Sequence, residues 1–436
     1  MTQLDEGTRF ASYVYAYPHK TAYRRIEPGL PLGPLWAGEQ RDSLFLYLHV
    51  PFCEQRCGFC NLFTQPVPES ERVAAYLDTL ERQVNVVRRA LDDGGAFSIA
   101  RAAIGGGTPT LLDAAQLERV FGLLRQMGFT RQAPMSVESS PETALPDRLA
   151  VIVGNGADRI SIGVQSFIDA ECKAVNRPQL AADVHMALRA IRDSGVPVLN
   201  LDLMYGLPGQ TLATFEYSLR SALEYGPEEV YLYPLYVRPL TTLGRKNTEA
   251  VDRTRIELYD RGKQMLLEQG YRQISMRMFK RPDAQGTPGP VYSCQADGMI
   301  GLGVGARSYT RAVHYSSEWA VGARGVRDII DRWIVKPDDD FGVADYGYVL
   351  DAREQRRRWL ILSLLSDDGL DLNAYRARFA STPADDFPQL AELGAYAVVE
   401  GDLLRLTQEG LARADQIGPW LFSETVRQRM ATYELQ

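Results

Sequence analysis

Three cysteines, Cys53, Cys57 and Cys60, follow a strand-like run with the spacing C-x3-C-x2-C. These intervals are too short for one regular element, so the thiols must surround a compact group within a loop. Thiolates hold iron–sulfur clusters, and three of them leave one iron of a four-iron cluster open. A zinc site is the alternative, but it needs four N or S ligands. No Cys or His follows nearby, and His49 lies within the strand-like run. The spacing therefore favours a cluster.

A glycine-rich segment, IGGGTPT (104–110), ends the second strand-like run. Glycines let the backbone approach a ligand closely and adopt positive φ. Ligands of parallel α/β proteins gather at the carboxyl ends of strands. No Gly-Lys-Ser/Thr follows, so this is not a P-loop. Three glycines alone are weak evidence, and their position makes a ligand loop the better interpretation.

Polar side chains lie near the ends of the next strand-like runs: Glu138, Gln165, Arg177 and Asp202. Each alone is more often structural than functional. Together they offer carboxylates for an amine or ribose hydroxyls, a guanidinium for a carboxylate and an amide for an adenine edge. These side chains follow a cysteine loop and a glycine loop in the sequence, and we expect all of them to converge on one ligand pocket.

The elements that position these residues alternate between apolar runs and helical patterns, which predicts βα units and a parallel sheet. Residues Val73, Leu77, Leu80, Val84 and Val87 recur at helical spacing, and Asp113 with Gln116 resembles a capping box. Two runs pair an apolar face with a small or polar face, which favours a barrel with a wet interior over a doubly wound sheet. The six expected strands are 43–50, 100–104, 133–139, 158–167, 197–206 and 228–235.

The chain is expected to divide into three parts. Residues 1–43 are an aromatic-rich segment covering the barrel, and 44–325 form the core with an irregular, Gly-rich extension at 271–325. Residues 350–436 contain helical patterns and then a hairpin around Gly401-Asp402, which resembles a winged-helix module. The predicted fold class is α/β, a partial (β/α)6 barrel with an N-terminal extension and a small C-terminal winged-helix-like α+β module.

Composition limits the function classes. The 436 residues carry a net charge of −7, which disfavours general nucleic-acid binding. No apolar stretch approaches the ~18 residues of a membrane span, and the first residues lack a signal-peptide pattern. Five cysteines do not make a disulfide framework. We expect a cytoplasmic protein without membrane association.

A resemblance to a known family rests on motifs in a fixed order. They are YLHVPFCEQRCGFC, IGGGTPT, SVESSP, ISIGVQSF, VNRPQ, LDLMYGLPGQT and GLGVGA. This series resembles the radical S-adenosylmethionine enzymes of the oxygen-independent coproporphyrinogen III oxidase-like group, over roughly residues 44–310. The resemblance implies a [4Fe-4S] cluster, S-adenosylmethionine and an electron donor of the flavodoxin or ferredoxin type. One-electron reduction of the sulfonium would give a 5′-deoxyadenosyl radical that abstracts hydrogen from a small-molecule or peptidic substrate.

The resemblance also assigns roles to residues. The cluster ligands would be Cys53, Cys57 and Cys60, with Tyr47 beside the cluster and Phe59 beside the adenine. The remaining cofactor-binding positions would be Gly106, Gly107, Thr108, Glu138, Gln165, Arg177 and Asp202. Some members of the group bind a second S-adenosylmethionine, and Pro234 and Arg307 resemble that site. Arg307 could equally bind a substrate carboxylate.

Departures from the family pattern bear on the reaction. Oxidases of this group carry a further cysteine where this chain has Leu62, and the haem-chaperone branch carries a His-Asn-x-x-Tyr-Trp segment where this chain has YSCQADGM (292–299). A third branch uses two S-adenosylmethionine molecules to methylate sp2 carbons. Methyl or methylene transfer to an aromatic substrate is therefore the leading expectation. A tetrapyrrole oxidoreductase and a haem-binding carrier are the alternatives.

Two further features are candidates near the site. Cys294 precedes the second Gly-rich stretch and could be a hydrogen-atom donor, a cluster ligand or a substrate handle, or a thiol that only packs a loop. The N-terminal segment could cover the barrel mouth or be a packing strap; its polar and aromatic residues are Tyr13, Tyr15, Tyr17, His19 and Lys20.

Overall fold

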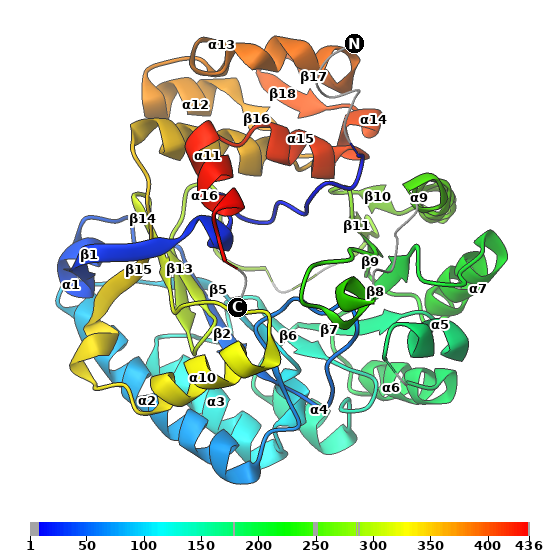
Figure 1. Ribbon diagram of the computed structural model, residues 1–436, viewed down its shortest axis with the longest axis horizontal. Coiled ribbons are helices and arrows are strands. Elements are labelled where there is room, and N and C mark those ends of the chain that lie inside the picture. The colour runs from blue at the N-terminus through cyan, green and yellow to red at the C-terminus, as the bar shows by residue number, and fades with distance from the viewer. Residues whose placement is uncertain (1–7, 178, 247–251, 285, 287, 435–436) are drawn as a thin grey trace.

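A computed structural model describes residues 8–177, 179–246, 252–284, 286 and 288–434; Pro178 of the VNRPQ motif is outside them. Its centre is a set of six parallel strands in chain order, each paired with the next (Figure 1). They are β2 (Leu44–Val50), β5 (Ile99–Gly106), β6 (Met135–Ser139), β7 (Arg159–Gln165), β8 (Val198–Tyr205) and β9 (Glu229–Pro234). The six predicted strands and the parallel α/β fold are confirmed.

Helices cover the outer side of these strands (Figure 1). In α2, the predicted apolar positions are buried, and α3 begins with the predicted capping box: Gln116 N donates to Asp113 Oδ1 at 2.9 Å and Asp113 N to Gln116 Oε1 at 3.1 Å. The covering helices are α2 (Ser70–Asp92), α3 (Ala114–Gln126), α4 (Pro146–Gly154), α5 (Asp169–Ala174), α6 (Ala181–Asp193), α7 (Leu212–Leu223) and α9 (Asp252–Glu268).

Alternation along β7 separates the two faces of the sheet. Ile160, Ile162 and Val164 are fully buried within the hydrophobic core. The intervening Ser161, Gly163 and Gln165 line a cavity on the opposite face. Because successive side chains of a strand point to opposite faces, this one sequence supplies both the core and the polar interior.

Residues 271–325 differ from the expectation of an irregular extension. Their described residues contain five short strands, β10 (Arg272–Gln273), β11 (Met278–Lys280), β12 (Met299–Leu302), β13 (Arg307–Tyr309) and β14 (Val313–Ser316). β11 and β10 extend the sheet beyond β9, and β12 pairs in parallel with β2 and leads through β13 and β14 to β15 (Val343–Val349) and β1 (Arg24–Pro31). Strands of two to four residues are too short to show a period-two pattern, so pairing partners rather than local sequence define them.

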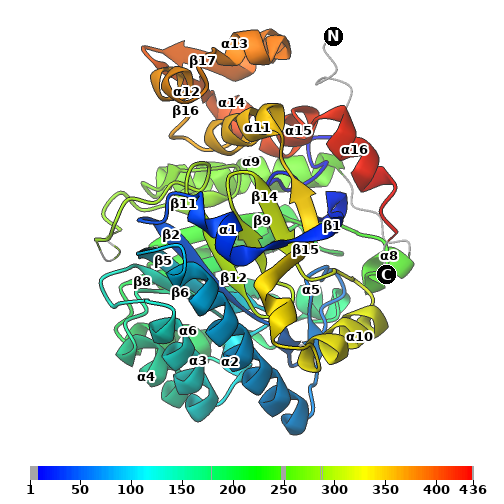
Figure 2. The same ribbon diagram turned by 90° about the vertical axis from the view of Figure 1, so that its left-hand side faces the viewer.

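The C-terminal part contains the predicted hairpin. Strands β17 (Ala397–Glu400) and β18 (Leu403–Leu406) are antiparallel around Gly401, whose φ is +61°, and β16 (Leu370–Asp371) completes a three-stranded sheet. Figures 1 and 2 show this module over one end of the large sheet, with the N-terminal segment passing beneath it. Ser12 N donates to Asp415 O at 3.2 Å, so the two segments are in contact. Its helices are α11 (Ala352–Leu364), α12 (Leu372–Phe379), α13 (Pro383–Asp386), α14 (Gln408–Leu411), α15 (Ala414–Trp420) and α16 (Glu424–Ala431).

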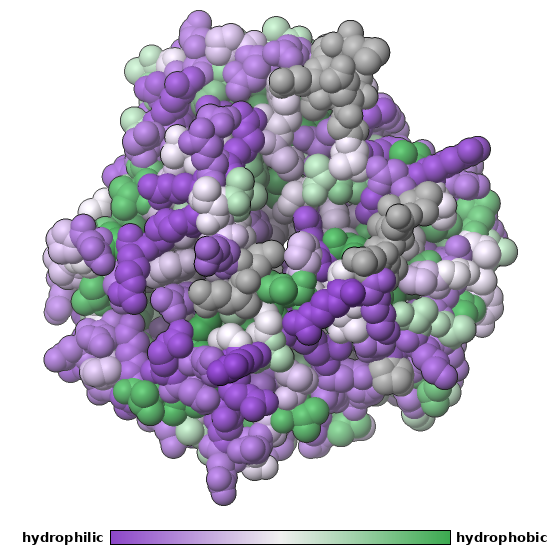
Figure 3. All heavy atoms as spheres, viewed as in Figure 1, coloured by the Kyte–Doolittle hydropathy of each residue, from purple (hydrophilic) through white to green (hydrophobic). Residues whose placement is uncertain are grey.

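The remaining elements are short connections. They are α1 (Leu32–Ala37), β3 (Phe52–Cys53), β4 (Gln65–Pro66), α8 (Thr242–Arg245), α10 (Ala323–Ile334) and four 3₁₀ turns, η1 (Lys20–Ala22), η2 (Pro109–Leu111), η3 (Asp339–Gly342) and η4 (Pro388–Tyr396). Figure 3 shows a face on which hydrophilic side chains predominate and hydrophobic ones are scattered. Among the described residues, no helix combines the length and apolarity needed to cross a bilayer.

Candidate functional site

A cavity of about 1010 Å³ lies at the carboxyl ends of the parallel strands. Every residue predicted for the site except Cys294 lines it. These residues are Tyr47, Cys53, Cys57, Phe59, Cys60, Gly106, Gly107, Thr108, Glu138, Gln165, Arg177, Asp202, Pro234 and Arg307. The ends of five neighbouring parallel strands, β5 to β9, therefore contribute to one site, as the topology of a parallel sheet requires.

The cysteine loop is held by backbone hydrogen bonds to neighbouring segments. Gly58 N donates to Val175 O at 2.7 Å, and Leu243 N donates to Gly58 O at 2.9 Å. Within the loop, Cys60 N donates to Cys57 O at 3.0 Å. A Cβ at Gly58 would lie 2.9 Å from Val175 O, so this contact requires glycine. These bonds fix the turn that presents the three thiols to the cavity.

The thiols lie in a poorly hydrated environment. Burial raises the pKa of Cys53 to about 12, with a further contribution from Cys60. Burial also raises the pKa of Cys60, and Cys57 adds to the effect. Burial therefore favours the protonated thiols of Cys53 and Cys60, and metal coordination is what would convert them to thiolates. Among the described residues, no group of three or more His, Cys, Asp or Glu side chains is close enough to hold a single metal ion.

The glycine loop lies directly against the cysteine loop. Gly106 has a φ of +120°, and a Cβ there would be 2.8 Å from Val50 O. A Cβ at Gly107 would overlap Phe52 O and lie 3.0 Å from Cys53 Sγ. Gly106 N donates to Glu138 Oε2 at 3.0 Å. Because Gly106 and Gly107 have no side chains, the backbone of the glycine loop can lie close to the cysteine loop and its thiols.

Arg177 connects the cysteine loop to the end of β7. Its Nη1 donates to Cys57 Sγ at 3.2 Å, its Nη2 to Gly163 O at 2.6 Å and its Nε to Gln179 Oε1 at 2.7 Å. Gln165, where β7 ends in an irregular register, has a φ of +68°. Such a conformation is uncommon for a residue other than glycine and is concentrated at functional sites.

Two acids occupy the inner face of the sheet. Glu138 faces the cavity, and burial raises its pKa to about 7, with Asp202 adding repulsion. Burial raises the pKa of Asp202 to about 6, although Asn200 Nδ2 donates to Asp202 Oδ1 at 2.8 Å. This side of the cavity would therefore favour a cationic or hydrogen-bond-donating group over an anion.

The N-terminal segment contributes to the site in part. Tyr13, Tyr15, His19 and Lys20 line the cavity as expected for a cover. Tyr17 does not, because its hydroxyl is buried and donates to Glu354, while Ser423 lies 3.2 Å away. Lining residues that sequence reasoning missed include Tyr236, Arg238, Tyr309, Trp319 and Tyr433. They come from short strands and loops with no periodic pattern, so no sequence signal could have identified them.

Cys294 lies apart from the other predicted residues. It is exposed and does not line the cavity, and its carbonyl accepts a hydrogen bond of 2.5 Å from Arg358 Nη2. The prediction of a catalytic or cluster-binding role for Cys294 is thus without structural support. The loop 292–298 is held to α11 by Arg358 rather than turned towards the strand ends.

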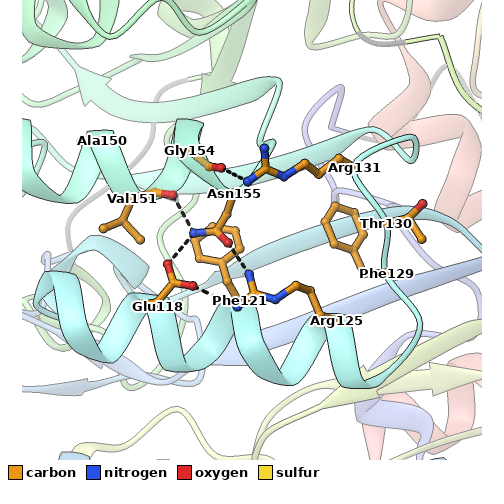
Figure 4. A pocket seen from close by; sticks show the side chains of 10 residues that line it. All are labelled: Glu118, Phe121, Arg125, Phe129, Thr130, Arg131, Ala150, Val151, Gly154 and Asn155. Carbon is orange, nitrogen blue, oxygen red and sulfur yellow. Dashed lines mark hydrogen bonds and ion pairs between the residues drawn. The ribbon is translucent and has the colours of Figure 1, made fainter.

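A second cavity of about 670 Å³ lies between α3 and α4 on the outer side of the sheet. Figure 4 shows that its polar groups bond to one another. Asn155 Nδ2 donates to Glu118 Oε2 at 2.7 Å, Arg125 donates to Asn155, and Arg131 donates to the carbonyl of Gly154. The side chains of Glu118, Arg125, Arg131 and Asn155 are thus bonded within the protein, and none of the residues predicted for the site lines this cavity, so the first cavity is the candidate site.

Known proteins are similar to this chain in sequence. A family model described as the radical SAM superfamily matches residues 47–222. The chain is 28% identical over 379 residues to the oxygen-independent coproporphyrinogen III oxidase of Escherichia coli, covering 82% of this chain and 80% of that protein. It is 30% identical over 269 residues to the heme chaperone HemW of the same organism, covering 60% of this chain and 69% of that one.

A solved structure gives the same result for the fold. Coproporphyrinogen III oxidase (HemN) from E. coli, described as a radical SAM enzyme, superposes with a TM-score of 0.78 over 97% of this chain and 98% of that chain, at 23% identity. The likeness extends through the C-terminal module. With the family match, the 30% identity to a relative and the shared fold in agreement, this chain belongs to the radical S-adenosylmethionine superfamily.

Proposed function

We propose that this protein is a radical S-adenosylmethionine oxidoreductase that abstracts a hydrogen atom from a small substrate of the tetrapyrrole class or of similar size and charge. The observation that carries the proposal is the meeting of three thiols, a glycine loop and Arg177 in one cavity at the strand ends. The superfamily implies a [4Fe-4S] cluster and S-adenosylmethionine as cofactors.

The residues present suit both cofactors. Cys53, Cys57 and Cys60 supply three sulfur ligands and leave the fourth coordination position to another group. Gly106 and Gly107 form a cradle that a Cβ would fill, which suits a ligand pressed against the backbone. Glu138 and Asp202 offer carboxylates for an amine or hydroxyls.

The chain's own contribution is positioning and exclusion of water. When bound and reduced, the two cofactors together supply a carbon-centred radical that removes hydrogen from a C–H bond. Arg177 holds Cys57 and the end of β7 together through its three hydrogen bonds, so the cysteine loop and the polar strand face keep a fixed separation. Aromatic residues of the N-terminal segment, Tyr13 and Tyr15, lie over the cavity and restrict solvent.

The choice of oxidation over methyl transfer rests on the relatives. The relatives reported above are oxygen-independent coproporphyrinogen III oxidase and the heme chaperone HemW, and they give the expected methyl transfer no support. Leu62, which replaces the additional cysteine of the oxidase pattern, lines the cavity. With leucine here, the cavity wall lacks the thiol of the oxidase pattern, so turnover of coproporphyrinogen III is tested directly.

The test is anaerobic turnover of the full chain after cluster reconstitution, with dithionite, S-adenosylmethionine and coproporphyrinogen III. We expect 5′-deoxyadenosine to form and S-adenosylhomocysteine to be absent, and Cys53→Ala to abolish both cluster and product. Formation of S-adenosylhomocysteine together with 5′-deoxyadenosine would restore the methyltransferase hypothesis. Stoichiometric haem binding without cofactor cleavage would replace the proposal with a carrier function.

A further inference from the structure

Two basic side chains from distant parts of the chain line the same cavity. Lys20 begins η1, and Arg307 begins β13; both line the cavity. Lys20 Nζ lies 3.8 Å from the ring centre of Trp319, and Arg307 Cζ lies 4.6 Å from that of Tyr15. We name Lys20 and Arg307 the basic pair. Aromatic rings hold both cations in place and leave their charges uncompensated.

Neither member of the basic pair has an anionic partner. The ion pairs among the described residues include neither side chain, and Nη1 of Arg307 is buried without a hydrogen bond. The ring of Tyr15, over which Arg307 lies, also contacts the ring of His19, the residue before Lys20, at 6.4 Å between ring centres. Burial and then the charge of Arg307 lower the pKa of Lys20. Partly desolvated like charges are costly unless an anion joins them.

Other arginines also line this cavity. Arg177 makes three hydrogen bonds within the protein. Arg238 Cζ lies 4.8 Å from the ring centre of Tyr236, so it too is held by an aromatic ring. Apart from burial, the groups that act most strongly on the pKa of Arg307 are tyrosine hydroxyls, Tyr15 first. The basic pair thus has the properties of a site that a ligand completes.

The surroundings define the ligand. A guanidinium and an ammonium in the lining of one cavity suit a carboxylate, because its two oxygens can accept hydrogen bonds from both. The adjoining lining is aromatic, with Tyr15, Tyr309, Trp319 and Tyr433, which suits a flat unsaturated body. Glu138 and Asp202 line the same cavity and disfavour an anion beside them. The basic pair and the two carboxylates would therefore orient a ligand that has one anionic end.

We propose that the basic pair binds a carboxylate of a flat, unsaturated substrate and so fixes which end of it faces the reacting centre. This inference rests on the proposed function, because it concerns the substrate of the same cavity. Lys20 lines the same cavity as Cys57 and Cys60 of the cysteine loop. The carboxylate of a second S-adenosylmethionine has the same chemistry, and the experiment separates the two sources.

The experiment measures binding of 2-naphthoate and of uncharged 2-naphthamide to the reconstituted full-length protein by calorimetry under anaerobic conditions. We expect wild type to bind the carboxylate at least about tenfold more tightly than the amide. Lys20→Gln/Arg307→Gln should lose that preference, while Lys20→Arg and Arg353→Gln, an exposed cation of α11, should keep it. Unchanged iron content in each variant shows that the site has formed. No preference in wild type, or a preference that survives in the double variant, overturns the proposal.

A second arm counts S-adenosylmethionine bound per chain by equilibrium dialysis. The same number in wild type and in the double variant supports a substrate carboxylate, and a loss of one molecule assigns the basic pair to a second cofactor and overturns the proposal. Formation of 5′-deoxyadenosine by wild type is measured separately. Cleavage without carboxylate preference refutes the basic pair alone, and carboxylate preference without cleavage refutes the proposed function alone.

Discussion

The guanidinium of Arg277 donates to the carboxylate of Asp415 in the interior of the protein, where the two side chains are 3% and 1% exposed. Arg277 directly precedes β11 at the edge of the large sheet, whereas Asp415 belongs to α15 of the C-terminal module. The Arg277 Cζ also lies 3.9 Å from the ring centre of Tyr13, and the Tyr236 hydroxyl donates to Asp415. One buried ion pair therefore joins the sheet, the C-terminal module and two residues that line the cavity.

Replacing one partner of this pair should be strongly destabilising. Asp415→Ala leaves Arg277 buried and unpaired, and we expect a loss of about 3–5 kcal/mol in the free energy of unfolding. Glu409→Ala in the same module breaks only the solvent-accessible pair with Arg413 and should cost less than about 1 kcal/mol. Urea denaturation of both variants gives the comparison. Equal, small losses would show that the buried pair does not hold the module in place.

A methyl group at Gly107 should disrupt the cysteine loop. The added Cβ of Gly107→Ala would overlap Phe52 O and press on Cys53 Sγ, so we expect the purified variant to lose most of its reconstituted iron. Gly154→Ala at the end of α4 is the matched control, since nothing lies within 4 Å of its Cβ. Iron and sulfide analysis after anaerobic reconstitution measures the effect. Full iron content in Gly107→Ala would mean that the two loops can separate without loss of the site.

The periodic pattern of apolar residues in the sequence predicted the strands and helices that are long enough to show it. The strands of the parallel core are long enough to show alternation, as in Ile160, Ile162 and Val164, and α2 shows a clear helical period. The strands that complete the sheet, such as β12 and β13, have four and three residues, and pairing with distant strands defines them. Tertiary pairing of this kind leaves no local signal.

The residues of the site also fall into those that could be predicted from the sequence and those that could not. Side chains that end parallel strands, such as Glu138 and Asp202, could be predicted because topology brings strand ends together. Trp319 and Tyr433 reach the cavity from a loop and from the chain segment after α16, and their approach depends on how the C-terminal module packs. Cys294 is the reverse case, because its neighbourhood in sequence suggested a place near the site, whereas in the structure it is exposed and does not line the cavity.

Arg177 should tune the bound cluster. Its Nη1 donates to Cys57 Sγ at 3.2 Å, and hydrogen bonds and positive charge at ligand sulfur favour the reduced, more negative state of a cluster. Arg177→Met removes the charge with similar length, so we expect retained iron and a more negative midpoint potential in a redox titration followed by electron paramagnetic resonance. Arg177→Lys should shift the potential less. An unchanged potential in Arg177→Met would assign the arginine to loop packing alone.

Cys294 should be dispensable for cofactor cleavage. Because it lies outside the cavity and is exposed, we expect Cys294→Ser to form 5′-deoxyadenosine at the wild-type rate. In the wild-type protein iodoacetamide should label Cys294 before the buried Cys172, as peptide mass spectrometry can measure. A severalfold loss of cleavage in Cys294→Ser would contradict its position outside the site.

Stability of the cluster-free protein should depend on pH through Glu138. Burial raises its pKa from 4.5 to about 7, so between these values the folded state holds a proton that the unfolded state has released. The stabilisation from this proton is complete below pH 4.5 and is lost as the pH rises through about 7. Glu138→Gln removes the dependence, and its free energy of unfolding relative to wild type should therefore increase across this window. Water in the cavity screens the charge, so we expect an increase of about 1 kcal/mol, measured by urea denaturation below pH 4.5 and above pH 7. A difference between variant and wild type that stays constant with pH would show that Glu138 is as well solvated in the folded protein as in the unfolded chain.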